Sequence, residues 1–310
     1  MRKHACLAFL LLAAPLLAQE PKNVKLLTGL SPIQLQRTMN MMRASLGTHC
    51  DYCHVVNDKG AWDFASDAKP AKKEGREMIA LTKDLNDRNF GGRPVISCYT
   101  CHRGAEHPVN LVPLPQTAPP FPTPEHERPQ RPAPKDVIAR YAAAIGDTSK
   151  LANLSLKGTR VGWDGKEEPL EIAQEGEHFH VQTGSLVQDF DMKAGTVNGK
   201  PMNAGQLESM HQLADAFAFI KPSDIPADAR AVNATTLAAG NERFTFDENG
   251  LLIKRVVLTD TPIGRIPQQT EYSDYREVGG MKLPHTIEVA LVDPWVGATR
   301  RYRVIEPLKR

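Results

Sequence analysis

Two segments in the first third of the chain carry apolar residues at the spacing of a helix. In the first, Leu35, Met39, Met42 and Leu46 recur every three or four positions. A helix places such residues on one face, so the pattern predicts a helix with a single apolar stripe. Met41 falls off this stripe, and its side chain is expected to point elsewhere.

The ends of this first helix are also marked in the sequence. Ser31 is a good N-cap, Pro32 takes the first helical position, and Gln34 completes a capping box. Gly47 is the glycine that commonly follows a helix. The helix should therefore stop at Gly47 and lead the chain directly to Cys50.

The second segment repeats this plan. Residues 72–89 are expected to form a helix with Met78, Leu81 and Leu85 on one face. A turn at residues 89–94 follows, and a cysteine comes shortly after it. Both helices thus precede a cysteine-containing motif.

Beyond residue 135 the pattern changes to short alternating runs bounded by turns. Two helices are expected, at residues 136–145 and 206–218. The expected strands are residues 155–161, 170–174, 178–183, 242–246, 251–258 and 287–292. Residues 247–250 have the composition of a hairpin turn. This part should be β-rich and antiparallel, with an embedded helix.

Between the two parts, residues 108–134 are rich in proline, which favours an extended, semi-stiff spacer. We therefore expect an α+β chain: a small, mostly α-helical domain, a Pro-rich linker, and an antiparallel β-rich half-barrel-like domain. The expected boundaries are 1–18 for a signal peptide, 19–107 for the helical domain, 108–134 for the linker and 135–310 for the β-rich domain.

The haem assignment comes from the cysteines. Residues 50–54 read Cys-Asp-Tyr-Cys-His and residues 98–102 read Cys-Tyr-Thr-Cys-His, and together they use four of the five cysteines. C-x-x-C-H is the attachment sequence of c-type haem, in which two thiols bond the porphyrin and the histidine binds the iron. A zinc site or a redox dithiol would not explain the histidine after each second cysteine. The expected attachment residues are Cys50, Cys53, Cys98 and Cys101, with His54 and His102 as proximal iron ligands of two covalently bound haem c groups. The helical domain is therefore expected to be a dihaem c-type cytochrome domain.

The sixth iron ligand decides what each haem can do. A methionine thioether closes the iron and suits electron transfer, whereas an open position suits peroxide chemistry. Met39, with Met42 as the alternative, is the candidate for the first haem, and Met78 for the second. Methionine on such a face also serves as core packing. His49 and His107 are less well placed.

The N-terminus predicts export. A basic start at residues 1–4 and an apolar run at residues 7–17 resemble a secretory signal peptide cleaved after Ala18, and an uncleaved anchor is the alternative. Cys6 would leave with the signal. We expect a periplasmic or otherwise exported protein. Peripheral association with a membrane is compatible with this expectation.

Net charge and the remaining polar residues argue against several other classes of function. The formal charge of +2 gives no electrostatic case for nucleic-acid binding. His178 and His180 share a strand face, but two ligands are too few for a typical metal site. Asp274 and Arg276 are expected to form a structural ion pair. No catalytic constellation stands out in the β-rich part.

Residues 24–108 resemble the haem-binding part of the photosynthetic reaction-centre cytochrome c subunit family. The shared runs are Phe-Ala-Ser-Asp at 64–67, the helix sequence at 78–86, and Cys-Tyr-Thr-Cys-His-Arg-Gly at 98–104. In that family the helix methionines are the sixth ligands, which by position implies Met39 and Met78. That subunit has four haems, whereas this chain has one pair of motifs. The β-rich part resembles, more loosely, the half-barrel of bacterial lipoprotein-carrier proteins.

The resemblance implies a non-enzymatic carrier of single electrons between redox partner proteins in the periplasm or at the membrane. The β-rich part would dock a partner or a membrane surface, or hold a lipophilic guest, by analogy of fold alone. The alternatives are a haem enzyme of the dihaem peroxidase kind, which needs an open iron, and a redox-sensing module whose β-rich part binds a ligand.

Overall fold

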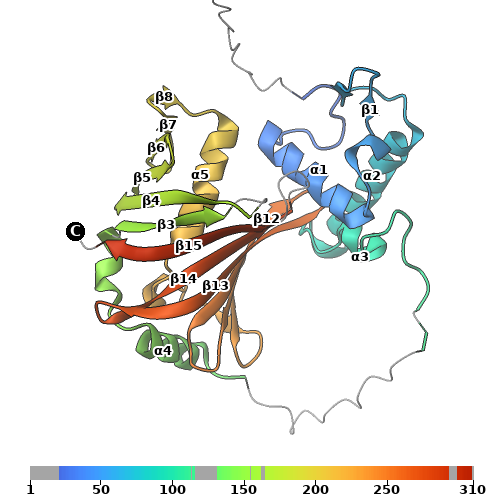
Figure 1. The fold of residues 1–310 in the computed structure, drawn as a ribbon. Coiled ribbons are helices and arrows are strands. Elements are labelled where there is room, and N and C mark those ends of the chain that lie inside the picture. Colours follow the sequence, from blue (N-terminus) through green and yellow to red (C-terminus); the bar gives the residue numbers. More distant parts are fainter. Residues whose placement is uncertain are drawn as a thin grey trace, which may run out of the picture.

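The computed structural model describes residues 21–112, 114–115, 131–153, 155–161, 165–292 and 299–308. The expected signal peptide and most of the expected linker lie outside these residues. The described chain has a helical part, at the right in Figure 1, and a larger β-rich part at the left. This arrangement confirms the α+β class.

The helical part consists of three helices, a 3-10 turn and two short strands. Its elements are α1 (Pro32–Leu46), the 3-10 turn η1 (Cys50–Tyr52), β1 (Val55–Val56), β2 (Trp62–Asp63), α2 (Pro70–Phe90) and α3 (Cys98–His102). β1 and β2 pair antiparallel into a small hairpin. Both C-x-x-C-H motifs therefore lie on short helical turns that follow a longer helix.

The caps of α1 are confirmed. The Ser31 hydroxyl accepts a hydrogen bond from the Gln34 amide, and the Gln34 side chain accepts one from the Ser31 amide at 2.9 Å. Gly47 ends the helix in the left-handed region at φ 65°. A Cβ at Gly47 would collide with the Gly104 carbonyl, and the Gly104 amide donates to the Ser45 carbonyl at 2.9 Å. The end of α1 is thereby joined to the loop after the second motif.

The β-rich part is one antiparallel sheet, in which thirteen strands of the described chain pair in the order β8-β7-β6-β5-β4-β3-β15-β14-β13-β12-β11-β10-β9. The edge strands β8 and β9 do not pair with each other, so the sheet stays open. The strands are β3 (Ser155–Val161), β4 (Glu167–Glu175), β5 (His178–Thr183), β6 (Leu186–Phe190), β7 (Gly195–Val197), β8 (Lys200–Pro201), β9 (Arg230–Ala231), β10 (Thr236–Ala239), β11 (Glu242–Phe246), β12 (Leu252–Thr261), β13 (Gly264–Val278), β14 (Met281–Leu291) and β15 (Thr299–Leu308).

Burial on the sheet follows the alternation in the sequence. Along β5, Phe179, Val181 and Thr183 are buried and the residues between them are exposed. The buried face packs against α5 (Ala204–Phe217) and α4 (Pro134–Ile145) in one large core. Figure 1 shows α5 across the face of the curved sheet. The remaining short helices are η3 (Thr148–Asn153) and η4 (Pro222–Asp224).

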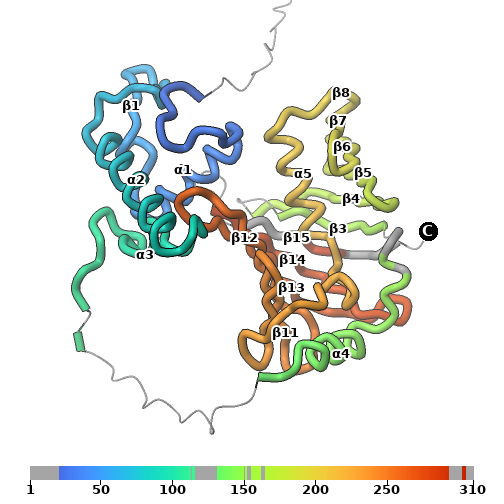
Figure 2. The backbone as a smooth tube through the Cα atoms, turned by 180° about the vertical axis from the view of Figure 1, so that it is seen from behind, coloured from blue at the N-terminus to red at the C-terminus, as the bar shows by residue number. Residues whose placement is uncertain are grey.

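The two parts meet at the turn between β12 and β13, which Figure 2 shows reaching the helical part. Ile263 on this turn is fully buried in a cluster that includes Leu27, Met41, Ile79 and Cys98. Met41 thus lies off the stripe of Met39 and Met42, as expected, but it is the more deeply buried side chain. Its side chain faces the β12–β13 turn, which the sequence of the helix alone could not reveal.

An ion pair adds a second link between the two parts. The Arg37 guanidinium on α1 donates to the Glu208 carboxylate on α5. Both side chains are only about a quarter exposed, at 27% and 24%. The helical and β-rich parts thus touch through one apolar and one ionic contact.

Candidate haem-attachment sites

The first motif forms a tight helical turn. Cys50 opens η1, and the amide of His54 donates to the Cys50 carbonyl at 3.0 Å. Cys53 ends the turn. The side chains of Cys50 and Cys53 are both partly buried. Burial raises the pKa of the Cys53 thiol. The turn presents both thiols and the imidazole within five residues.

The imidazole of His54 is packed among aromatic side chains. Its Nδ1 is buried without a hydrogen bond. The Phe64 ring lies edge-on to it at 5.1 Å between centroids, and Trp62 stacks on Phe64 at 5.3 Å. Burial, together with the charge of Lys72, lowers the pKa of His54. This favours the neutral imidazole that metal ligation requires.

A cavity of about 570 Å³ opens beside this turn. Its lining includes Cys50, Val55, Trp62, Arg43 and Lys69. Cofactor sites of roughly 300–1,000 Å³ commonly combine apolar side chains with a few polar or charged groups, and this cavity is lined by both kinds. Arg43 Nε is buried without a partner, which is a donor suited to an anionic group such as a porphyrin carboxylate.

The second motif coincides with α3. Ser97 and Thr100 form its capping box, Cys98 is buried and Cys101 is exposed. Burial raises the pKa of the Cys98 thiol. The Nδ1 of His102 lies 3.0 Å from the Ala105 carbonyl oxygen. Such a bond fixes the ring and leaves Nε2 free to bind a metal.

The candidate methionines lie in two different settings. Met39 and Met42 on α1 are partly buried and pack against the cluster around Ile263. Met78 on α2 is 44% exposed, and its stripe neighbours Leu81 and Leu85 are exposed as well. The expected apolar stripe of α2 is present, but its side chains do not face the protein. The buried face of that helix is Ile79, Thr82 and Asn86 instead.

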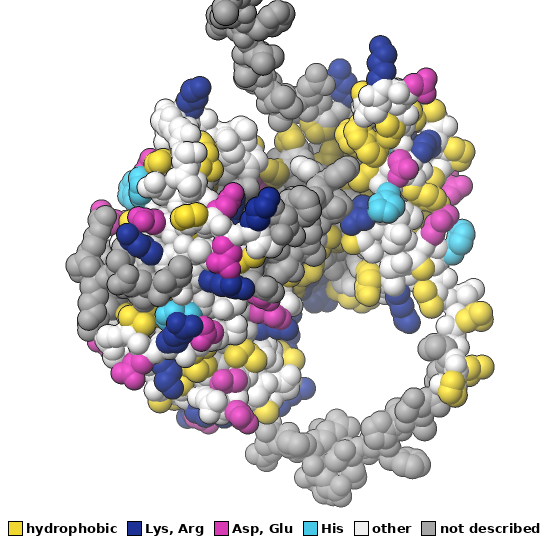
Figure 3. Space-filling model, viewed as in Figure 1, with side chains coloured by type: hydrophobic (Ala, Val, Ile, Leu, Met, Phe, Trp, Pro, Cys, Tyr) yellow, Lys and Arg dark blue, Asp and Glu magenta, His cyan; other side chains and the backbone are white. Residues whose placement is uncertain are grey.

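Exposed apolar side chains concentrate in the helical part, as the yellow surface at the right of Figure 3 illustrates. Among the described residues, the large exposed hydrophobics outside residues 56–114 are Val232 and Ile253 alone. Those within that range are Val56, Trp62, Phe64, Met78, Leu81, Leu85, Val95, Tyr99, Val109, Leu111, Val112 and Leu114. An apolar surface of this kind marks a binding site for an apolar partner or cofactor.

The residues present fit haem c. The four cysteines of the two motifs are free thiols. His54 has an orphaned buried nitrogen, and His102 is oriented by a carbonyl. Apolar side chains without protein cover surround both motifs. Haem c, when bound, supplies an iron that exchanges one electron.

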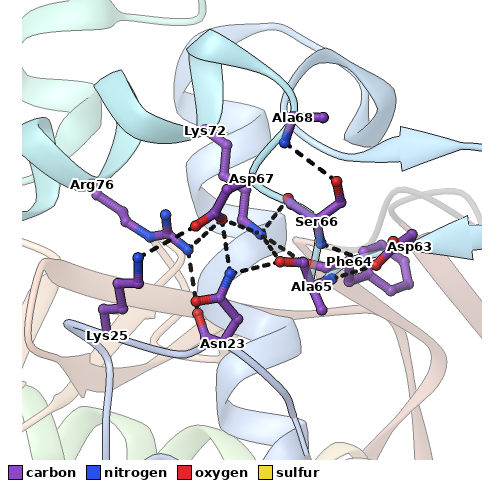
Figure 4. Close-up of polar contacts among 10 residues, drawn as sticks. All are labelled: Asn23, Lys25, Asp63, Phe64, Ala65, Ser66, Asp67, Ala68, Lys72 and Arg76. Carbon is purple, nitrogen blue, oxygen red and sulfur yellow. Dashed lines mark hydrogen bonds and ion pairs between the residues drawn. The ribbon is translucent and has the colours of Figure 1, made fainter.

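A cluster that the sequence patterns did not single out lies beside the first motif (Figure 4). The Asp67 carboxylate accepts hydrogen bonds from Asn23 at 2.8 Å and Arg76 at 2.8 Å, and pairs with Lys72 at 3.1 Å and Lys25 at 3.3 Å. The hydrogen bonds from Arg76 and Asn23 hold the pKa of Asp67 well below its usual range. Asn23 and Lys25 lie 44 and 42 residues before Asp67, so only the fold brings them to it.

Tyr52 joins the two motifs. Its hydroxyl donates to the Glu106 carboxylate at 2.6 Å. This hydrogen bond raises the pKa of Tyr52 to about 12. Glu106 lies in the loop after α3, so the spacer residue of the first motif contacts the exit of the second. Glu106 is also 3.9 Å from His107, whose side chain is exposed.

The N-terminal part of the chain has recognisable relatives. Residues 13–132 match the family model of the photosynthetic reaction centre cytochrome C subunit. Cytochrome c-554 of Chloroflexus aurantiacus is 36% identical over 95 residues, which is 29% of this chain and 21% of that protein. The photosynthetic reaction center cytochrome c subunit of Rubrivivax gelatinosus is 32% identical over 95 residues, 24% of this chain and 25% of that subunit. The match thus spans about a fifth to a quarter of these relatives.

Two solved structures align with just over half of this chain, at low similarity. A LolA superfamily protein from Nitrosomonas europaea covers 57% of this chain and 93% of its own, with 10% identity and a TM-score of 0.33. A putative outer membrane lipoprotein-sorting protein domain from Vibrio parahaemolyticus covers 56% and 90%, with 7% identity and a TM-score of 0.31. Similarities of this size carry no argument about function.

Histidine and charged side chains of the β-rich part form surface pairs. His180 lies 2.7 Å from Asp189, and no described group of three His, Cys, Asp or Glu side chains is arranged to hold a metal ion. Asp274 and Arg276 form the expected ion pair at 2.6 Å. In the part of the chain that the structure describes, no helix combines the length and apolar content needed to cross a membrane.

Proposed function

We propose that this chain is an exported dihaem c-type cytochrome that carries electrons one at a time between periplasmic or membrane redox partner proteins. One observation carries the proposal. Two C-x-x-C-H turns with free thiols lie within the part of the described chain where nearly all exposed large apolar side chains gather. Attachment of two porphyrins would cover that surface and use those thiols.

In this proposal Cys50 and Cys53 bind the first haem, and Cys98 and Cys101 bind the second. His54 and His102 are the proximal iron ligands. Met39 closes the first iron, with Met42 as the alternative. Met78 closes the second. These ligand pairs make the protein a carrier and not an enzyme, because a thioether excludes small molecules from the iron.

Residue environments support these roles. The bond between His102 and the Ala105 carbonyl holds the ring in place, and ligating histidines usually have such a partner. Burial lowers the pKa of His54, which favours the neutral form of its imidazole. Tyr52 and Glu106 tie the two motif turns together, which would keep the two sites at a fixed separation.

The β-rich part is proposed to dock a redox partner or a membrane surface, or to hold a lipophilic guest. Its open sheet, covered on one face by α5, supplies an extended surface for such contacts. Export through a cleaved signal peptide would place the protein in the periplasm, where cysteines are modified by the haem attachment machinery.

Counting covalent haem tests this proposal. The purified chain, denatured and assayed as the pyridine haemochrome, should contain two haems per polypeptide. Cys50→Ala with Cys53→Ala should leave one, and Cys98→Ala with Cys101→Ala should leave one. A single haem in the unaltered chain, or no loss in either double variant, would overturn the proposal.

A further inference from the structure

The first motif is surrounded by cations that are partly buried. The Lys72 ammonium donates to the carbonyls of Phe64, Ala65 and Ser66 at 2.9, 3.0 and 2.7 Å, and its side chain is only 11% exposed. The Phe64 ring packs on His54. Lys72 is therefore held against the backbone of the residue that contacts the proximal imidazole.

Two further cations lie on the same side. Arg76, one helical turn after Lys72, is 18% exposed and bonds Asp67. Lys69 donates to the carbonyl of Asp51, inside the first motif, and lines the cavity beside Cys50. Partly buried charges are screened less by salt than exposed ones, so the electrostatic effect of these cations on the first motif is only weakly screened.

The anions nearby do not cancel this charge. Asp67 is one carboxylate among Lys25, Lys72 and Arg76. Asp51, Asp63 and Glu74 are exposed to solvent, which screens them. The partly buried charge around the first motif is thus mainly positive.

The surroundings of the second motif differ. The flanking cations Arg93 and Arg103 are exposed. The exposed Glu106 carboxylate follows His102 in the sequence but bonds Tyr52 of the first motif, so it lies near both motifs and does not distinguish them. Within the described residues, the partly buried cation cluster therefore belongs to the first motif.

Reduction of a haem iron from Fe(III) to Fe(II) adds one negative charge to the site. A nearby cation stabilises the reduced form more than the oxidised form and raises the reduction potential. We infer that Lys69, Lys72 and Arg76 set the first haem site at a higher reduction potential than the second, so that a single electron on the protein resides mainly at the first site. This inference rests on the proposed function.

The size of the effect follows from Coulomb's law. A unit charge about 10 Å from the iron, at an effective dielectric constant of about 20, changes an equilibrium constant on the order of tenfold. For a one-electron couple, tenfold corresponds to about 59 mV. Removing one of these cations should shift the midpoint of the first site by roughly that amount.

A potentiometric titration of the holoprotein, followed by visible absorbance, tests the inference with paired variants of opposite sign. Lys72→Gln should lower the higher of the two midpoints by about 59 mV. Asp67→Asn, which keeps a hydrogen-bond acceptor but removes a negative charge, should raise the same midpoint. Lys72→Arg should restore the value of the unaltered protein.

Controls separate charge from structural damage. Lys83→Gln removes a cation of α2 outside the cluster and should leave the higher midpoint unchanged. A purely structural role would make Lys72→Gln and Asp67→Asn move the midpoint in the same direction. That result, a shift confined to the lower midpoint, or an equal shift with Lys83→Gln would each overturn the inference.

Failure of the inference is distinguishable from failure of the proposed function. Haem content and carbon monoxide binding are measured on the same samples. Two closed haems without the opposite shifts would reject only the charge assignment. One haem, or an iron that binds carbon monoxide, would reject the proposed function and this inference with it.

Discussion

At the scale of single residues, α1 carries three methionines with different surroundings. Met41 is buried against the β12–β13 turn, whereas Met39 and Met42 are partly buried at the margin of that cluster. A thioether that is committed to core packing cannot also reach an iron. This leaves Met39 and Met42 as the ligand candidates on α1, which is the choice that the stripe pattern had favoured.

Methionine variants test the ligand assignment. Met39→Ala and Met78→Ala should each remove part of the methionine-to-iron absorption band of the oxidised protein, and each should open one iron to carbon monoxide. Met41→Ala is the matched control. It should cost about 2–5 kcal/mol of stability as a core truncation, yet leave the band unchanged. Loss of the band in Met42→Ala and not in Met39→Ala would transfer the first ligand role to Met42.

Asp67 predicts an acid-sensitive element of stability. Its pKa is lowered in the folded state by the hydrogen bonds from Arg76 and Asn23. A depressed folded pKa contributes stability that is fully present above the unfolded value of about 3.9 and is lost as the pH falls through the folded pKa.

Urea unfolding at two pH values measures this contribution. The stability difference between the unaltered holoprotein and Asp67→Asn should be larger at pH 7 than at pH 3. Asp84→Asn, which removes an exposed pair with Arg88, should show little difference at either pH. If the difference in unfolding free energy between the unaltered protein and Asp67→Asn were larger at pH 3 than at pH 7, the assigned direction of the pKa shift would be wrong.

At the scale of elements, the β12–β13 turn is the piece that joins the helical and β-rich parts. Ile263 at its tip is fully buried. Gly264 beside it has φ 144°, and a Cβ there would come 2.7 Å from the Ser97 Cβ. The turn thus approaches the residue that caps α3, and with it the second motif.

Two isoleucines of the same hairpin test this contact. Ile263→Ala should destabilise the holoprotein by about 2–5 kcal/mol. Ile253→Ala, at a position that is 36% exposed on β12, should change stability by less than about 0.5 kcal/mol. Equal costs in chemical unfolding would mean that the tip does not anchor the two parts.

Elements with local signals were the predictable ones. The capping box at Ser31, the glycine at 47 and the alternation along β5 each act within a few residues, and all are confirmed. β13 was missed as a strand, because its run through Gln268, Gln269 and Glu271 is polar. Its strand state depends on pairing with β12 and β14, which is not visible in its own sequence.

At the scale of the whole molecule, sequence and structure agree on a helical part with two motifs and a β-rich part. The long-range contacts were not predictable. Met41 with Ile263, Arg37 with Glu208, and Tyr52 with Glu106 each join distant segments. The attachment motifs could be read directly because their chemistry requires a fixed local spacing.

The two parts share an interface, so changes in the β-rich part can reach the haem sites. The β12–β13 turn contacts Cys98, and α5 binds α1 through Glu208. The expected linker, residues 108–134, connects them covalently but lies mostly outside the described residues.

The central claim is that two covalent haems are closed by methionine. The most direct test is the visible spectrum of the reduced, full-length protein before and after addition of carbon monoxide. Our account predicts an unchanged spectrum, together with a methionine-to-iron band in the oxidised protein. A carbon monoxide shift would reveal an open iron, and the electron-carrier account would then give way to a haem enzyme or sensor.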